Sequence, residues 1–180
     1  RLGHRHQPFA VAREHLDGLV GLEFAENMPA TERAVYIEVR EGVDPAGYEA
    51  LVSEEQSVAD VLQLRENDAS SALTLRRHVR SFFQANRFLL EPLVRHVAGL
   101  IPAGPVVDLY AGVGLFGLSL AAGGADDVTL VEGERSSGAD LIANAEPLLH
   151  RVRIHRTSVE AFLHATAPAA HGRGRGVAGG

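Results

Sequence analysis

The sequence VVDLYAGVGLFG, residues 106–117, decides the fold of this chain. It joins a short apolar run that ends in Asp to a loop with Gly112 and Gly114, and then to a segment compatible with a helix. The apolar run is typical of a buried parallel strand. Glycine lets the backbone turn sharply and approach a ligand where a Cβ atom would collide. The stretch therefore predicts a strand, a loop with room for a ligand, and a helix in succession.

A second apolar run, residues 128–131, ends in Glu132, eighteen residues after Gly114. A carboxylate at the tip of a neighbouring parallel strand can accept both hydroxyl groups of a ribose that lies across the strand ends. A glycine loop alone is equally typical of a tight turn. The loop and Glu132 together favour a cofactor that contains a nucleoside.

The segments after the glycine loop continue an alternation of helices and strands. A helix is predicted over residues 115–122, and the glycine pair at 123–124 ends it. Either Ser136 or Ser137 is expected to cap a second helix that extends to Ala145. These lengths are typical of the helices that cross over between parallel strands.

A third strand is predicted over residues 152–156, followed by a loop and a short helix over 157–163. Strand, helix, strand, helix, strand is half of a doubly wound parallel sheet, which binds ligands at the carboxyl ends of its strands. Three residues lie at such ends: Tyr110, Glu132 and Ser158. The final segment, 164–180, is rich in Ala, Gly, Pro and Arg without an apolar period, which predicts a disordered tail.

Composition excludes several classes of site. The 180 residues suffice for one domain of ordinary size, or for a small domain and part of another. They contain no cysteine, which excludes disulfides, thiolate metal sites, iron–sulfur clusters and a cysteine nucleophile. The N-terminal histidines His4, His6 and His15 are poorly spaced for a metal, so no metal site is predicted. No apolar run approaches the length of a membrane span, and the N-terminus lacks a signal-peptide segment, so we expect a cytoplasmic protein with no membrane contact.

Charge is distributed unevenly along the chain, whose formal net charge is −6. Residues 1–70 carry fourteen acidic residues against six arginines, whereas residues 71–100 carry five arginines against one acidic residue. An acidic total argues against a general nucleic-acid coat. A basic segment inside an acidic chain is still compatible with a local phosphate contact.

The N-terminal part, residues 1–72, has a pattern that favours strands. Alternation of apolar and polar residues is clearest at 35–39, before a turn at 41–42, and is weaker at 9–12. Residues 57–62 fit a helix and a strand equally. The segment is therefore expected to be part of an antiparallel or α+β domain, and its residues indicate no chemistry.

An amphipathic helix is predicted from Asn86 onward, with Asn86 as its N-cap; Pro92 requires that the helix start late or kink there. Just before it stands Phe82-Phe83-Gln84. In one interpretation the phenylalanines are core anchors and Gln84 caps the helix. In the other, Gln84 meets a polar ligand group and nearby arginines meet phosphates. Those arginines are Arg76, Arg77, Arg80 and Arg87.

Three motifs together resemble the S-adenosylmethionine-dependent RNA uracil-5 methyltransferases, which modify tRNA and 23S rRNA. They are SFFQAN at 81–86, DLYAGVGLF at 108–116 and VEG at 131–133. The first discriminates best, because a glycine loop followed by an acidic strand tip is common to most Rossmann-like methyltransferases. The resemblance covers roughly residues 73–163. It implies an incomplete Rossmann-like methyltransferase domain there, preceded at 1–72 by part of an α+β RNA-contacting domain.

The resemblance also implies roles for single residues. Gln84 matches the family's cofactor-binding glutamine, Tyr110 the aromatic residue of its glycine loop, and Glu132 its ribose-binding glutamate. Leu115 stands where a ligand-contacting asparagine is common, so at most its backbone would serve. Ser158 aligns with a polar position near the adenine. With Gly112 and Gly114, these residues are the expected S-adenosylmethionine site.

The sequence departs from the family after Leu163. The family's Asp-Pro-Pro-Arg motif, its nucleophilic cysteine and its glutamate base do not occur here, so no catalytic residue is assigned and this chain alone is expected to be inactive. Two alternatives stay open. One is a methyltransferase that acts on another substrate without covalent catalysis, and the other is an RNA-binding module that uses the basic segment at 76–95.

Overall fold

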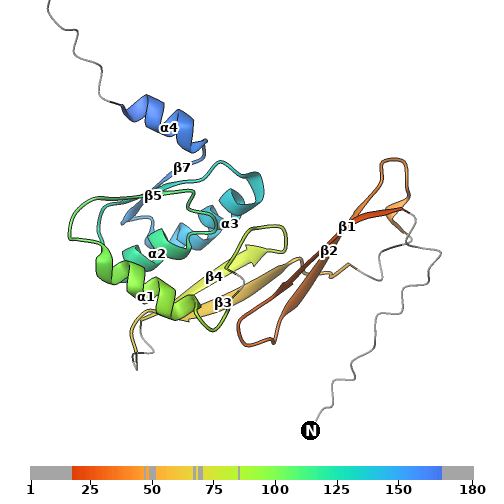
Figure 1. Cartoon of the computed structure of the whole chain (residues 1–180), viewed down its shortest axis with the longest axis horizontal. Coiled ribbons are helices and arrows are strands. Elements are labelled where there is room, and N and C mark those ends of the chain that lie inside the picture. Colours follow the sequence, from red (N-terminus) through yellow and green to blue (C-terminus); the bar gives the residue numbers. More distant parts are fainter. Residues whose placement is uncertain are drawn as a thin grey trace, which may run out of the picture.

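The computed structural model describes residues 18–46, 48, 52–66, 68, 71–84 and 86–167. The expected strand at 9–12, the three N-terminal histidines and the tail beyond residue 167 lie outside these residues. The elements, coloured along the chain in Figure 1, are β1 (Leu19–Glu26), β2 (Arg33–Val39), β3 (Ser57–Gln63), β4 (Ala72–His78), α1 (Leu90–Leu100), β5 (Val106–Leu109), α2 (Leu115–Ala122), β6 (Val128–Val131), α3 (Arg135–Ala145), a 3₁₀ turn η4 (Glu146–Leu148), β7 (Val152–His155) and α4 (Val159–Thr166).

A parallel sheet in the order β5-β6-β7 forms the C-terminal half. All four residues of β6 are buried, which is why its sequence is continuously apolar apart from Thr129. The helices α2 and α3 lie on the side of this sheet that faces the β3–β4 hairpin (Figure 1). The α/β prediction is confirmed, since this is part of a Rossmann-like fold, and α2 has the predicted bounds.

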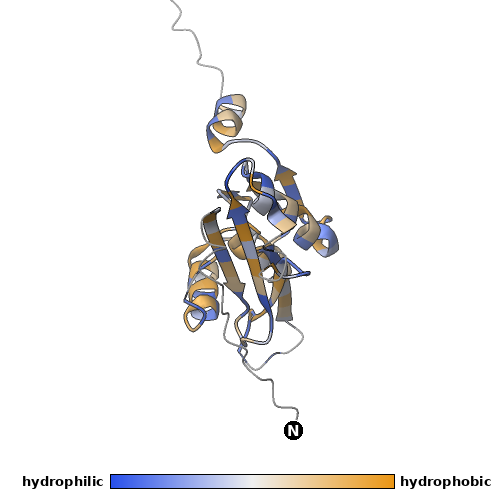
Figure 2. Ribbon diagram, turned by 90° about the vertical axis from the view of Figure 1, so that its right-hand side faces the viewer, coloured by the Kyte–Doolittle hydropathy of each residue, from blue (hydrophilic) through white to orange (hydrophobic). Residues whose placement is uncertain are grey.

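Two antiparallel hairpins, β1–β2 and β3–β4, form the N-terminal half. Buried positions alternate with more exposed ones along β3 and β4. Figure 2 shows that the strands carry both hydrophobic and hydrophilic residues. The main core is continuous across both halves, because Leu62, Leu73 and Leu75 of the second hairpin pack with Leu118 and Leu130. This hairpin spans the boundary expected between residues 72 and 73.

The helix ends differ from the predictions in three places. Asn86 is not an N-cap: α1 begins at Leu90, and the side chain of Asn86 accepts a hydrogen bond from the Phe88 N–H at 3.2 Å. Pro92 therefore lies in the first turn, where its missing N–H costs no helical hydrogen bond. Helix α3 is capped by the Glu134 carboxylate instead of a serine. Helix α4 reaches Thr166, inside the segment expected to be a disordered tail.

The arginines of the basic segment pair with carboxylates, most of which lie in the acidic N-terminal part of the chain. Every arginine between residues 71 and 100 lies within 4 Å of a carboxylate; the pairs are Arg76–Glu55, Arg77–Asp60, Arg80–Glu23, Arg87–Glu26, and Arg95 with Glu66 and Glu91. The interpretation in which these arginines meet phosphates therefore competes with ion pairs inside the protein.

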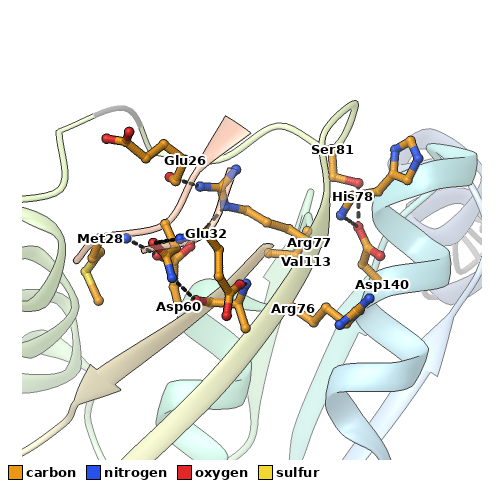
Figure 3. Close-up of polar contacts among 12 residues, drawn as sticks. Glu26, Met28, Glu32, Asp60, Arg76, Arg77, His78, Ser81, Val113 and Asp140 are labelled. Carbon is orange, nitrogen blue, oxygen red and sulfur yellow. Dashed lines mark hydrogen bonds and ion pairs between the residues drawn. The ribbon is translucent and has the colours of Figure 1, made fainter. Parts of the chain in front are cut away.

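One of these ion pairs is buried between the two hairpins. The Arg77 Nε lies 3.1 Å from the Asp60 carboxylate, and the side chains are 10% and 1% exposed. The other Asp60 oxygen accepts the Met28 N–H, and Arg77 also donates to the Glu26 carbonyl at 2.8 Å (Figure 3). The pair thus fixes the β1–β2 hairpin against β4.

Replacing Arg77 with Leu should destabilise the fold by about 3–5 kcal/mol, because Asp60 would stay buried without its cation. Combining it with Asp60→Asn should restore part of that loss. Arg76→Leu is the matched control on the same strand, since its ion pair with Glu55 is exposed and should contribute under about 1 kcal/mol. Urea denaturation measures all three variants. Similar losses for Arg77→Leu and Arg76→Leu would contradict the role given to the buried pair.

Candidate functional site

The glycine loop after β5 has an unusual backbone. Tyr110, Gly112 and Gly114 all have positive φ, at 60°, 58° and 100°. Residues with a side chain seldom adopt positive φ, which explains why two of these positions are glycine and makes Tyr110 a strained residue. A Cβ atom on Gly114 would overlap the Leu118 side chain, whereas one on Gly112 would meet nothing within 4 Å. The loop is therefore packed tightly at Gly114 and open above Gly112.

Glu132, at the tip of β6, holds this loop. This residue is 7% exposed, and one carboxylate oxygen accepts the Gly112 N–H at 2.7 Å. The other oxygen accepts the N–H of Glu134 at 2.6 Å, just before α3. Each carboxylate oxygen has a further lone pair, so the group can still accept hydroxyl hydrogen bonds. The loop and Glu132 are thus brought together as the sequence predicts.

Asp108 supports the loop from the other side of the turn, a role that sequence analysis did not assign. Its carboxylate accepts the Gly117 N–H at 2.8 Å, in the first turn of α2. Burial raises the pKa of Asp108, as does the nearby charge of Glu132, while the hydrogen bond from Gly117 works against both. The position of this aspartate at the end of β5 was the available signal in the sequence.

Three further residues of the expected cofactor site, Tyr110, Leu115 and Ser158, differ from one another in exposure and in their contacts. Tyr110 is 69% exposed and its hydroxyl donates to Glu160 of α4 at 3.1 Å, a hydrogen bond that raises the pKa of the tyrosine. The Leu115 side chain is buried in the core, which leaves its backbone toward the loop. Ser158 is the N-cap of α4, accepting the Ala161 N–H. Its Cα lies beside Gly133, next to Glu132.

Gln84 lies apart from this group. It lines a hollow of about 720 Å³ between β1 and the segment that precedes α1, and its neighbours there include Phe83 and Arg77. Neither Gly112 nor Glu132 lines that hollow. The Arg77 guanidinium lies 4.6 Å from the Phe83 ring centre, so this phenylalanine packs on the buried ion pair. Gln84 is not a helix cap, because α1 begins six residues later without a side-chain cap.

Among residues 18–167, apart from the gaps given above, no group of three or more His, Asp or Glu side chains could hold a metal ion. None of the helices described there has the length and apolarity to cross a membrane.

Replacing Asp108 with Asn should stabilise the protein at neutral pH. Because folding raises the pKa of Asp108, the folded state favours the protonated acid, and stability from this group is lost as the pH rises through the raised pKa. The variant keeps an oxygen for the Gly117 N–H without the buried charge. The free energy of unfolding of the variant should exceed that of the parent most near pH 7. The difference should shrink as the pH falls to about 3.8, the ordinary pKa of an aspartate. Urea denaturation at both pH values tests this, and an advantage that grows in acid would contradict it.

Comparison with known proteins yields both sequence and structural relatives. No family model matches the chain. Two curated proteins named tRNA (uracil(54)-C(5))-methyltransferase, from Pyrococcus abyssi and Pyrococcus horikoshii, are each 45% identical over 47 residues, which is 26% of this chain and 12% of theirs. The chain thus spans only a small part of the length of these relatives.

The solved structure of the Pyrococcus abyssi tRNA (uracil-54, C5)-methyltransferase with S-adenosyl-L-homocysteine has a similar fold. Its TM-score is 0.52 at 22% identity, over 73% of this chain and 37% of that one. The match in sequence and the likeness in fold confirm, for part of this chain, the resemblance to the RNA uracil-5 methyltransferase family.

Proposed function

We propose that this chain is the cofactor-binding part of an S-adenosylmethionine-dependent methyltransferase that methylates C5 of a uridine in RNA. The observation that carries the proposal is the buried Glu132 carboxylate at the tip of β6, which holds Gly112 beside an open space. The names of the relatives favour tRNA over 23S rRNA as the substrate. A tRNA-modifying role is consistent with the expected cytoplasmic location.

The described residues fit the proposed cofactor. Glu132 retains lone pairs for the two ribose hydroxyls, and the space above Gly112 lets a ligand approach the backbone. Tyr110 directly follows β5 and Ser158 directly precedes α4, and both lie at the same edge of the sheet. Leu115 would contribute only its backbone, and Gln84 would need to reach the site from the 81–86 segment. When bound, S-adenosylmethionine supplies an electrophilic methyl group on a sulfonium.

The reaction on uracil needs a residue that this sequence does not contain. C5 of uracil is a weak nucleophile until a thiolate adds to C6, and a base must later remove the C5 proton so that the thiolate can leave. The 180 residues include no cysteine. We therefore assign cofactor binding to this chain and the covalent step to residues outside it.

The two alternatives differ in their support. A methyltransferase without covalent catalysis is favoured by the absence of cysteine and would use the same cofactor site. An RNA-binding module based on the 76–95 segment has less support, because its arginines pair with carboxylates of the same chain. Such a module would show RNA affinity that falls steeply as salt is added.

Calorimetric titration of S-adenosylmethionine tests the cofactor site. The protein should bind, and Glu132→Gln should weaken binding about tenfold or more, the effect of losing a hydrogen bond to a charged group. Glu146→Gln is the control, because Glu146 is exposed at the far end of α3 and should leave the affinity unchanged. Equal affinities for the two variants would show that Glu132 does not bind the cofactor.

A methyl-transfer assay tests the assignment of the covalent step. With labelled S-adenosylmethionine and tRNA that lacks 5-methyluridine, this cysteine-free chain should form no 5-methyluridine. Formation of it would exclude thiolate catalysis by this chain. Label transfer to a protein or small-molecule pool instead would support the alternative methyltransferase.

A further inference from the structure

Strand β4 has an unusual neighbour along one of its edges. It pairs with β3 on one side, and on the other side two side chains of α3 bond to its backbone. Asn144 accepts the Arg76 N–H at 2.9 Å and donates to the Arg76 carbonyl at 2.8 Å, as a residue of a paired strand would. Asp140 accepts the His78 N–H at 2.8 Å.

The spacing of these two side chains explains why a helix can replace a strand here. Four residues along a helix advance about 6 Å, and two residues along a strand advance about 6.6 Å. Asp140 and Asn144 are four residues apart on α3, and the backbone groups of Arg76 and His78 that point outward are two residues apart on β4. Helix α3 thereby bonds to the outward backbone groups at Arg76 and His78 on this edge of β4.

Asn144 also reaches the glycine loop. Its amide nitrogen donates a second hydrogen bond, to the Val113 carbonyl at 3.0 Å, between Gly112 and Gly114. Asn144 is 8% exposed, and its side-chain oxygen and both amide hydrogens form hydrogen bonds. A single buried amide therefore joins β4 to the loop of the proposed cofactor site.

Asp140 makes the corresponding link to the segment that carries Gln84. Ser81 is 5% exposed, and its hydroxyl donates to the Asp140 carboxylate at 2.6 Å and lies 3.0 Å from the hydroxyl of Ser136. Figure 3 shows the Ser81 hydroxyl and the His78 backbone N–H both directed at the Asp140 carboxylate. Ser81 is the first residue of SFFQAN, so α3 fixes the start of that segment.

We propose that Asn144 and Asp140 are positioning residues for the cofactor site. They set the placement of the 81–86 segment relative to the glycine loop, so the affinity for S-adenosylmethionine depends on two side chains assigned no contact with it. This inference rests on the proposed function, and it adds that Gln84 and the glycine loop act together through α3.

Asn144→Asp is the sharpest single change. It keeps the size of the side chain but turns the donating nitrogen into an oxygen that faces the Arg76 and Val113 carbonyls. Binding of S-adenosylmethionine should weaken about tenfold or more. Ala143→Asp is the control, because it adds the same charge to an exposed position of α3 and should bind normally. Equal affinities for the two variants would overturn the role of Asn144.

A double-mutant cycle separates positioning by Asp140 from simple destabilisation. Asp140→Ala should weaken binding of S-adenosylmethionine several-fold in the parent chain. In a chain that already carries Gln84→Ala the effect should be much smaller, because the Gln84 contact that Asp140 positions is then absent. Asp140→Asn should bind nearly as the parent does, since its amide oxygen can accept the same two hydrogen bonds. An equal fold-change in both backgrounds would mean loss of folded protein and would overturn the proposal.

Hydrogen exchange distinguishes failure of this inference from failure of the proposed function. If the parent chain does not bind S-adenosylmethionine, the proposed function fails. Exchange without ligand then tests the inference alone. Asn144→Asp should accelerate exchange in residues 110–116, and Asp140→Ala in residues 81–86, with β6 and β7 unchanged. Unchanged exchange in those two segments would overturn the link through α3.

Discussion

Two hydrogen bonds to one buried carboxylate shape the C-terminal half of this protein. After each parallel strand the chain turns back, and the turn leaves backbone N–H groups without a partner. Glu132 accepts one such group from the loop after β5 and another from the turn that leads into α3. A buried charge is tolerated only when it is satisfied in this way. The conformations of the two turns are consequently linked through one side chain.

Strand β4 has a comparable role between the two halves of the chain. Arg77 on one of its faces holds the β1–β2 hairpin through Asp60 and the Glu26 carbonyl, and its outer edge is held by α3. The uneven charge of the sequence also helps to join the two halves, because acidic residues of the N-terminal part pair with arginines of the basic segment that follows. A charge imbalance that suggests a polyanionic partner can equally hold a fold together.

The sequence was sufficient to predict elements with local signals. The apolar runs of β5 and β6 and the helix bounded by Gly114 and Gly123 follow from hydrophobic period and glycine placement, and the structure has all three elements. The expected burial is found only for β6, because β5 is an outer strand of the described sheet and none of its residues is buried. The proximity of Glu132 to Gly112 followed from the rule that parallel strands present their carboxyl ends at one edge.

Other features depend on contacts that no local pattern reveals. The serines Ser136 and Ser137 could each have capped α3, and only the reach of the Glu134 side chain to two N–H groups decides the cap. The partners of Asp140 and Asn144 on β4 are 62 and 68 residues distant in sequence. Their polar side chains look like ordinary surface residues of an amphipathic helix until β4 is placed beside them.

The position of β5 bears on how such a protein is made. In the described sheet β5 is an outer strand with a partner on one side, and Val107 on it is 52% exposed. The outward side of β5 therefore offers backbone groups that no other strand of the described sheet pairs with, together with apolar surface. Unpaired strands of this kind recruit other chains. Newly made protein is therefore prone to aggregate through this edge, whatever the stability of the finished fold.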